Sequence, residues 1–335
     1  MKAIVVGGVK ENPQLVWADV PDASCGPAEV LVDVRAAAVN RADLMQARGN
    51  YPPPPGASDI LGLEMAGVIR EVGSEVTGWR PGDRVCALLP GGGYAELAAV
   101  PAGMLLRLPD HWSFAQGAAV PEVWYTAYIN LFREGELKAG ETALIHAGAS
   151  GVGTAAIQLA VDAGARAFTT AGSEAKCDRC RALGAALAVN YKTHDFLAEV
   201  MAASDHQGVD VILDPVGGAY LERNIAALRQ FGRLVIIATL GGSKGELHVG
   251  RVLGKRLRIV GSTLRGRSVA EKIAITREFA AAVWPKLAAG TLRPIIDTIF
   301  PIAEAQAAHE HVAADRNVGK VILAVGSGAG EIEPG

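Results

Sequence analysis

The hydrophobic positions along the chain follow two different patterns. From residue 1 to about residue 120, short runs rich in Val and Ile, such as "EVLVDVRAAAV" and "MAGVIREVG", are separated by Gly and Pro. Short β-branched runs bounded by turn residues are typical of strands. This part of the chain is therefore predicted to form a compact β-rich domain.

Residues 121–260 alternate apolar runs with Ala-rich stretches. The apolar runs include "TALIHAG", "RAFTTAG", "VDVILDPVG" and "GRLVIIATL", and the stretches between them, such as "VGTAAIQLAVDAGA" and "AYLERNIAALRQFG", have helical composition. Strands that alternate with helices predict βαβ units around a parallel sheet. We expect a second domain of the α/β class here.

The pattern of residues 261–325 predicts a return to the first domain. One long helix is expected over "SVAEKIAITREFAAAVWPKLAAG", and closing strands such as "KVILAV" follow it. Residues 326–335, "GSGAGEIEPG", have the composition of a disordered tail.

Charge and composition narrow the classes of partner. The 335 residues carry 32 Lys and Arg against 35 Asp and Glu, a net charge of −3, so we expect no nucleic acid or anionic lipid as a partner. No apolar run approaches the roughly 20 residues that span a bilayer. The start "MKAIVVGGVKENP" suits a first strand better than a secretion signal, and four cysteines do not make a disulfide framework. A cytoplasmic location is therefore expected.

Two of the cysteines, Cys177 and Cys180, form a C-x-x-C pair within "AGSEAKCDRCRALGA". This spacing can hold zinc or exchange thiols, but four-ligand zinc sites usually pair two such clusters. Cys25 and Cys86 lie far away along the chain, and the residues around the pair indicate an amphipathic helix. We expect no metal there.

The run "TALIHAGASGVGTAAIQLA" places a glycine-rich loop between a strand and a helix. Glycines permit a tight turn, while the exposed N–H groups and the dipole of the following helix favour an anion. The G-x-x-G-x-G spacing is not the commoner G-x-G-x-x-G, yet the strand before it and the helix after it predict dinucleotide binding. The predicted cofactor-binding loop includes Gly148, Gly151, Val152 and Gly153.

The end of the next strand, "RAFTTAGSEAK", bears on the choice of dinucleotide. An NAD site usually has Asp or Glu there to accept hydrogen bonds from the ribose. Here Gly172 and Ser173 leave room, and Lys176 can pair with a 2′-phosphate. Lys176 also fits a solvated helix position, and Glu174 stands beside it, but the missing strand-end carboxylate favours NADPH.

Several motifs resemble one family over nearly the whole chain. "GETALIHAGASGVGTAAIQLA" is similar to the quinone oxidoreductase pattern of the medium-chain dehydrogenase/reductase superfamily, and "NRADLMQARGNYPPPPGASDILGLEMAG" resembles that branch's N-terminal motif. "LLPGGGYAE", "GSEAK", "NYK" and "NVGKVIL" occur in the same order. The resemblance implies a GroES-like catalytic domain (1–120, completed by 261–325), a Rossmann NADPH-binding domain with a doubly wound parallel sheet (121–260), and an active site in the cleft between them.

The resemblance also implies roles for individual residues. Asn40 is expected to hydrogen-bond the nicotinamide ribose, and Tyr51 to line the acceptor pocket. The alternatives are a turn-forming Asn40 and a packing role for Tyr51, but polar groups on loops often orient ligands, which favours function. Further cofactor contacts are implied for Ser150, for Lys176 and Tyr191 beside the 2′-phosphate, and for Thr239 and Asn317 near the nicotinamide half.

The same superfamily includes zinc alcohol dehydrogenases. Those relatives have "GHE" where this chain has Gly62, Leu63 and Glu64, and leucine cannot bind zinc. Their structural-zinc lobe is matched only by the short "LLPGGGYAEL", so Lewis-acid chemistry is not expected. His309 and His311, two residues apart in a predicted helix, face different ways and are interpreted as surface residues.

Without a metal or an evident acid, the acceptor must take hydride easily. A quinone does so because the charge spreads over a conjugated ring and two oxygens, while the cofactor carries the chemistry. We therefore predict a zinc-independent NADPH:quinone oxidoreductase. The alternatives are an NADPH-dependent reductase of activated C=C bonds and an NADPH-binding structural protein of crystallin type.

The apolar run at Ile259 and Val260 is predicted to be a sheet edge, and with the family likeness it implies an edge-to-edge homodimer.

Overall fold

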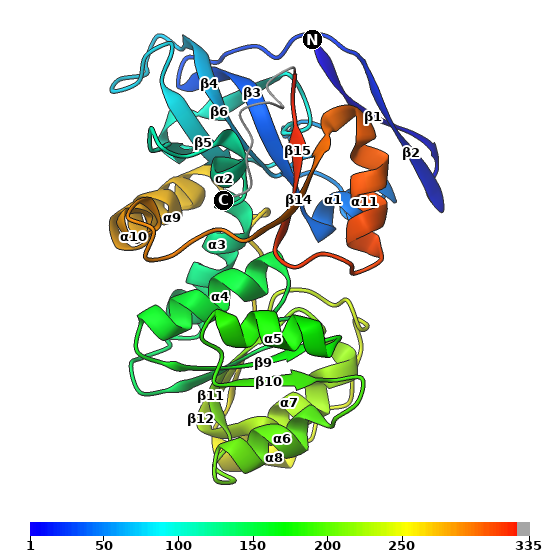
Figure 1. The fold of residues 1–335 in the computed structure, drawn as a ribbon, viewed down its shortest axis with the longest axis vertical. Coiled ribbons are helices and arrows are strands. Elements are labelled where there is room, and N and C mark those ends of the chain that lie inside the picture. Colours follow the sequence, from blue (N-terminus) through cyan, green and yellow to red (C-terminus); the bar gives the residue numbers. More distant parts are fainter. Residues whose placement is uncertain (327–335) are drawn as a thin grey trace. The chain divides into compact units, whose positions relative to one another are not determined.

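The structure, a computed structural model, describes residues 1–326. The chain divides into two compact units (Figure 1). The first contains residues 1–125 and 264–326, and the second contains residues 126–263. The tail expected at 326–335 lies, except for Gly326, outside the described residues.

A seven-stranded sheet forms the first unit. Its order is β14-β15-β3-β4-β5-β7, with β6 paired to β3, and β14–β15 is the only parallel pair that the described residues form within this sheet. β1 and β2 form a separate antiparallel ribbon. The strands are β1 (Lys2–Val9), β2 (Asn12–Asp19), β3 (Glu29–Val39), β4 (Glu64–Val72), β5 (Arg84–Leu88), β6 (Leu97–Pro101), β7 (Leu105–Arg107), β14 (Ile296–Pro301) and β15 (Lys320–Ala324).

Strand β3 organises this sheet. Its sequence EVLVDVRAAAV is mostly buried, because the strand pairs with β4, β6 and β15 and its Val and Ala side chains pack well on a pleated surface. The closing strand expected at "KVILAV" is confirmed as β15, which lies antiparallel to β3 with Val321 opposite Val39. This register places Lys320 beside the residue that follows β3.

The helices of the first unit include one departure from the predicted pattern. The single helix expected over residues 268–290 is wrong, because α9 ends at Ala282 and α10 begins at Trp284. Pro285 has no amide hydrogen and its ring would clash with the preceding turn, so it is accommodated only in the first turn of a new helix. The helices are α1 (Arg41–Ala47), η1 (Ala102–Met104), α2 (Phe114–Ala118), α3 (Pro121–Tyr128, which contains the unit boundary), α9 (Val269–Ala282), α10 (Trp284–Ala288), η4 (Ile302–Glu304) and α11 (Ala305–Ala313).

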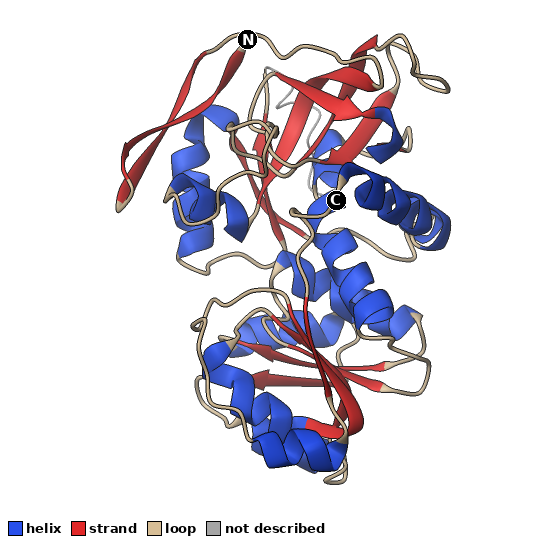
Figure 2. Cartoon of the chain, turned by 180° about the vertical axis from the view of Figure 1, so that it is seen from behind, coloured by secondary structure: helices blue, strands red, loops and turns tan. Residues whose placement is uncertain are grey.

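The second unit is a parallel six-stranded sheet in the order β10-β9-β8-β11-β12-β13. This order is the doubly wound Rossmann topology and confirms the predicted fold class. Figure 2 shows helices on both faces of the sheet. Its elements are η2 (Ile129–Glu134), β8 (Thr142–Ile145), α4 (Gly151–Asp162), β9 (Arg166–Ala171), α5 (Glu174–Ala182), β10 (Leu187–Asn190), α6 (Phe196–Ala203), β11 (Val209–Asp214), η3 (Gly218–Tyr220), α7 (Leu221–Ala227), β12 (Leu228–Ile236), α8 (Val249–Lys255) and β13 (Arg258–Gly261).

The helix expected over "AYLERNIAALRQFG" is only partly correct. α7 ends at Ala227, and "LRQFG" begins β12, which pairs with β11 from Leu228 and again from Arg233. The residues between these pairings form a bulge whose Phe231 has a φ of 62° and is 55% exposed. Sheet pairing therefore outweighs the local helical composition. Within residues 1–326, no helix is both long and apolar enough to cross a bilayer.

Candidate functional site

The glycine-rich loop connects β8 to α4 as the sequence predicts. Ser150 is the N-cap of α4, and its side chain accepts a hydrogen bond of 3.0 Å from the Gly153 amide. The amides of Gly151 and Val152 donate to no acceptor within residues 1–326, and both residues are half-buried. Two free N–H groups at the positive end of a 12-residue helix form a site for an anion.

Two glycines of this loop are required by the protein's own packing. A Cβ atom on Gly148 would lie 1.8 Å from Thr169 Oγ1, and one on Gly153 would lie 2.3 Å from the Ala147 carbonyl oxygen. The Gly148 amide also donates to the Thr170 carbonyl at 2.9 Å. The loop is therefore held tightly against β9, which orients the start of α4.

A second turn joins β9 to α5. Gly172 follows the strand, and Ser173 is the N-cap of α5, with its side chain accepting from the Lys176 amide at 3.3 Å. A Cβ atom on Gly172 would lie 3.0 Å from Tyr191 Oη and 3.6 Å from Lys192 Cε, so both side chains stand over this turn. Lys192 was not among the predicted site residues, although its position in "NYK" directly after β10 was a usable signal.

Glu174 lies beside Lys176 in the sequence, and its negative charge would disfavour a 2′-phosphate there. In the structure its carboxylate pairs with a different residue. Its Oε1 accepts a hydrogen bond of 2.8 Å from Arg181 on the exposed side of α5. Lys176 is half-buried on the same helix. Lys192 lies over the Gly172 turn, and Lys176 is in the first turn of the helix that follows it.

A buried polar chain braces the same edge of the sheet. His146, which follows β8, contacts Thr170 Oγ1 through Nδ1 at 3.0 Å and Asn224 Oδ1 through Nε2 at 2.8 Å. Asn224 in turn donates to Asp214 Oδ2, and this carboxylate also accepts from the Gly217 amide. Burial lowers the pKa of His146 to about 4, so the ring is neutral and carries its proton on Nε2.

Thr239 lies after β12 at the carboxyl edge of this sheet. It is exposed, its carbonyl accepts from the Gly242 amide at 3.0 Å, and its Cα lies 3.1 Å from where a Cβ on Gly217 would be. Ser150, Ser173, Tyr191 and Thr239 thus all follow the carboxyl ends of parallel strands, where α/β sheets bind their ligands.

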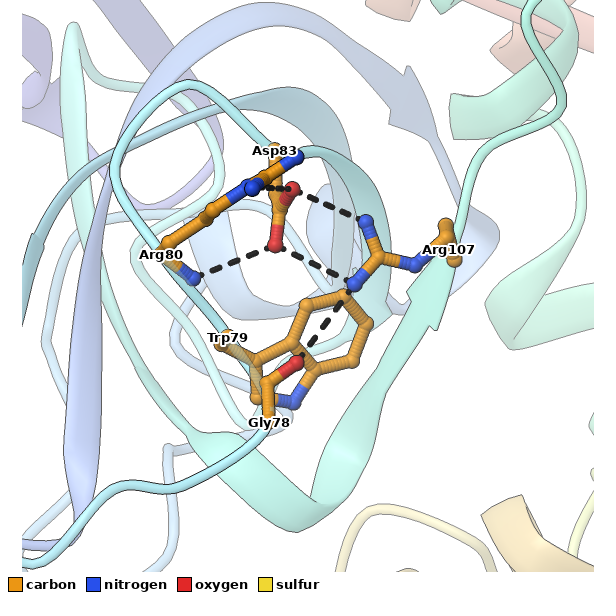
Figure 3. Close-up of a pocket in the computed structure, with 5 residues that line it drawn as sticks. All are labelled: Gly78, Trp79, Arg80, Asp83 and Arg107. Carbon is orange, nitrogen blue, oxygen red and sulfur yellow. Dashed lines mark hydrogen bonds and ion pairs between the residues drawn. The ribbon is translucent and has the colours of Figure 1, made fainter.

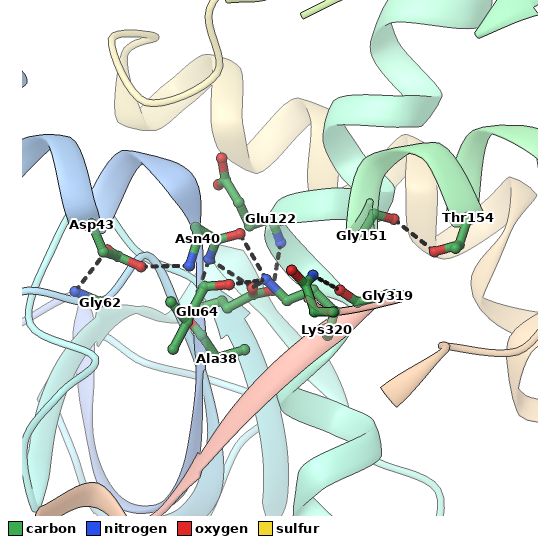
Figure 4. Close-up of polar contacts among 12 residues, drawn as sticks. Ala38, Asn40, Asp43, Gly62, Glu64, Glu122, Gly151, Thr154, Gly319 and Lys320 are labelled. Atoms are coloured by element: carbon green, nitrogen blue, oxygen red, sulfur yellow. Dashed lines mark hydrogen bonds and ion pairs between the residues drawn. The ribbon is translucent and has the colours of Figure 1, made fainter. Parts of the chain in front are cut away.

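A buried ion pair is the centre of the polar cluster in the first unit. Lys320, the first residue of β15, contacts Glu64 Oε1 at 2.8 Å, Asn40 Oδ1 at 2.7 Å and the Val39 carbonyl at 2.8 Å (Figure 4). The side chains of Lys320 and Glu64 are 4% and 0% exposed. The sequence pattern pointed to neither residue as part of a site.

Asn40 is buried beside Glu64 and Lys320 and is largely shielded from solvent. It is 8% exposed and is the N-cap of α1, and its Nδ2 donates to Glu64 Oε1 at 2.9 Å and to the Ala38 carbonyl at 3.3 Å. Asp43, fully buried in the first turn of α1, accepts from the amides of Asn40 and Gly62. Burial raises the pKa of the Asp43 carboxyl to about 6.

The other predicted residues of the first unit lie on loops. Tyr51 is half-buried, with the Arg265 guanidinium 5.2 Å from its ring centroid. Arg265 also donates to the Tyr51 carbonyl at 3.2 Å and to Gln46 Oε1 at 2.7 Å, which fixes this loop. Asn317 donates to the Gly319 carbonyl at 2.7 Å, immediately before Lys320.

The two histidines of α11 differ in burial. The surface interpretation is wrong for His309, which is 6% exposed and lies 3.2 Å from the Tyr94 hydroxyl. That hydroxyl donates to Asp43, so His309 is part of the packing behind the cluster. His311 is half-buried and contacts Asp297 at 2.9 Å.

The residue that precedes Glu64 has no side-chain atom that could bind a metal. Leu63 is 1% exposed and presents only carbon atoms beside Glu64. Among residues 1–326, no group of three or more His, Cys, Asp or Glu side chains is arranged to hold a metal ion. Cys177 and Cys180 are both fully buried free thiols in α5.

A surface hollow of about 340 Å³ is lined by none of the predicted site residues (Figure 3). Arg107 stacks 4.6 Å from the Trp79 ring centroid, and Asp83 pairs with both Arg107 and Arg80. The three charged side chains that line the hollow are therefore already paired with one another.

Comparison with known proteins places this geometry in a family. Residues 26–110 match the alcohol dehydrogenase GroES-like domain, and residues 151–280 match the zinc-binding dehydrogenase family. The quinone oxidoreductase of Sus scrofa is 32% identical over 300 residues, which cover 88% of this chain and 88% of that protein. The chain belongs to the medium-chain dehydrogenase/reductase superfamily. It is part of the branch that contains quinone oxidoreductases and enoyl reductases.

Solved structures of this superfamily have the same fold. Escherichia coli quinone oxidoreductase complexed with NADPH has a TM-score of 0.86 at 28% identity, covering 97% of this chain and 100% of that one. CurK enoyl reductase has a TM-score of 0.85 at 29% identity, covering 97% and 99%. Pikromycin polyketide synthase component PikAII of Streptomyces venezuelae is 36% identical over 312 residues, but these 90% of the chain span only 8% of that protein.

Proposed function

We propose that the chain binds NADPH and transfers its hydride to a quinone without a metal ion. The observation that carries the choice of cofactor is the turn after β9. Gly172 and Ser173 stand where an NAD site has a carboxylate, and Tyr191 and Lys192 lie over them with Lys176 on the adjoining helix. A 2′-phosphate there would lie near the cationic residues Lys176 and Lys192, while the neighbouring Glu174 carboxylate is paired with Arg181.

The residues after β8 fit the rest of the cofactor. The free amides of Gly151 and Val152 would hold the pyrophosphate at the start of α4, and Ser150 fixes the turn that presents them. Thr239 and Asn317 would approach the nicotinamide half. When bound, NADPH supplies the hydride, and the protein supplies position and exclusion of water.

Asn40 has a restricted role in this proposal. Both hydrogens of its amide are used, by Glu64 and the Ala38 carbonyl, and Lys320 uses one lone pair of Oδ1. Asn40 therefore has no hydrogen left to donate to the ribose, and its side chain also faces the Asp43 amide in a capping box at the start of α1. The internal contacts hold the oxygen in one orientation.

On the acceptor side, the proposal assigns Tyr51 to a flat aromatic substrate. The Arg265 contacts fix the loop that carries Tyr51, and its ring can stack on a quinone. Leu63 itself offers no atom that can bind zinc, so in this proposal activation of the acceptor would come from the conjugation of the quinone itself.

Reduction of an activated C=C bond is the second candidate. The similarity to CurK enoyl reductase and to segments of polyketide synthases favours it. Storage of NADPH without turnover, as in crystallin-type relatives, is the third outcome of the test. A steady-state screen distinguishes them, since NADPH is oxidised rapidly by quinones in the first case, by enones and enoyl thioesters in the second, and by neither in the third.

We further propose a homodimer formed through β13. This strand is the last of the six-stranded sheet, and Ile259 on it is 39% exposed. In the neighbouring α8, Val249 and Leu253 are 67% and 78% exposed. An uncovered sheet edge with apolar neighbours is normally protected by pairing.

A further inference from the structure

Glu122 has an unusual environment at the start of α3. Its backbone amide donates to Glu64 Oε2 at 2.8 Å, so the Glu64 carboxylate caps the helix. The Glu122 side chain points away from Asn40, Glu64 and Lys320 (Figure 4). Its Oε2 is fully buried and has no hydrogen-bond partner among the described residues. An ionised carboxylate with a buried, unpaired oxygen is strongly disfavoured, so the neutral acid is the stable form.

The charges around Glu122 support the neutral form. Burial, followed by the carboxylates of Glu64 and Asp43, raises the pKa of Glu122 to about 8, although Lys320 and Lys272 oppose this shift. The titratable and charged groups that face it come from β4, α1, β15, α9 and two loops, namely Glu64, Asp43, Lys320, Lys272, Tyr51 and Arg265. At neutral pH the carboxyl therefore holds a proton that no described protein group accepts.

This acid lies on the acceptor side of the first unit. The charge of Glu122 contributes, after burial, to raising the pKa of Tyr51, which requires the two side chains to be near each other. Glu122 as a whole is half-buried, although its Oε2 atom is fully buried. Tyr51 is the residue to which the proposed function assigns the substrate ring.

We propose that Glu122 is the proton donor of the reaction. The inference rests on the proposed function, in which NADPH supplies a hydride and so both electrons. Hydride addition to a quinone leaves the hydroquinone monoanion, and the O–H bond of Glu122 breaks as a new O–H bond forms on the phenolate oxygen. With an activated alkene, the same proton goes to the enolate. The Glu122 carboxylate then regains a proton from water, which the nearby Glu64 and Asp43 charges favour.

The test compares Glu122→Gln with the wild type and with Glu222→Gln. Gln keeps the shape of the side chain but has no acidic proton. Glu222 is the matched control, since it is also the second residue of a helix, α7, but is exposed. Infrared difference spectra at pH 7 are expected to show a protonated carboxylic acid that disappears in Glu122→Gln and persists in Glu222→Gln.

Turnover supplies the second readout. The kcat of Glu122→Gln with the better acceptor is expected to fall about 100-fold, the usual contribution of a general acid. The wild-type kcat/KM is expected to fall as pH rises through about 8, where Glu122 would lose its proton, and this fall is expected to be absent in Glu122→Gln. Glu122→Asp, which restores an acid, is expected to recover the fall and part of the rate. This variant also keeps the test decisive if Glu122→Gln folds poorly.

The outcomes separate the two proposals. A wild type that reduces neither quinones nor enones refutes the proposed function, and the proton-donor role with it. If the wild type is active, two results would refute the donor role alone. One is that Glu122→Gln loses no infrared band of a protonated carboxylic acid, and the other is that this variant retains the fall in kcat/KM near pH 8.

Discussion

The buried ion pair between Lys320 and Glu64 makes a strong prediction about stability. Lys320→Met keeps a side chain of similar length but removes the ammonium group. Glu64 Oε1, Asn40 Oδ1 and the Val39 carbonyl then each lose a donor that lies 2.7 to 2.8 Å away. Glu64 retains its hydrogen bonds from Asn40 and from the Glu122 amide, but its charge has no counterion in the interior.

The size of the effect follows from burial. The two side chains are 4% and 0% exposed, and removal of one partner from such a pair costs about 3–5 kcal/mol. Arg70→Met is the control, because the Arg70–Asp33 pair is 53% and 31% exposed and an exposed pair contributes about 0–1 kcal/mol. The double variant Lys320→Met/Glu64→Gln removes both charges and is expected to recover at least half of the loss.

Tryptophan fluorescence is a suitable assay. All five tryptophans lie in the first unit, which also contains both ion pairs: Trp17, Trp79, Trp112, Trp124 and Trp284. The free energy of unfolding is obtained from urea titrations at constant m-value. If Lys320→Met loses no more stability than Arg70→Met, the cluster is hydrated and the argument from burial is wrong. Because Lys320 lowers the pKa of Glu122, the same variant is also expected to move the fall in kcat/KM above about pH 8.

Four further predictions concern the site and assembly. Lys176→Ala should raise the KM for NADPH much more than the KM for NADH, because the lost contact with the 2′-phosphate costs about 1.5–3 kcal/mol of binding free energy. Equal effects on the two cofactors would mean that Lys176 does not contact the phosphate. Tyr51→Ala should lower kcat/KM for quinones about tenfold with unchanged NADPH affinity, while Ser150→Val should abolish cofactor binding in fluorescence titrations; the reverse pattern would contradict the assignment. Elemental analysis of active protein should find no stoichiometric zinc, and restoration of chelator-treated enzyme by zinc would overturn this. Light scattering should give a dimer that Ile259→Lys dissociates, whereas a wild-type monomer at micromolar concentration would exclude the β13 interface.

The sequence determined the features that depend on contiguous residues. The strand, glycine loop and helix of residues 142–162 are local, because the apolar run, the turn glycines and the Ser150 cap follow one another directly. The doubly wound sheet follows from the alternation of such units. Local signals also had limits, since Pro285 divides the last long helix and pairing with β11 converts "LRQFG" into strand.

Only the tertiary structure decided which polar side chains share the buried cluster. Glu64, Glu122 and Lys320 are separated by 58 residues or more, and each stands in a sequence context that is equally compatible with a solvated charge. The pairing of β15 with β3, and of β3 with β4, brings Lys320 beside Asn40 and Glu64. Their chemistry then depends on burial, which raises the cost of an unpaired charge and keeps a proton on Glu122. Hydrophobic pattern and motif spacing carry no information about such long-range pairing, so the cluster could not be predicted from the chain alone.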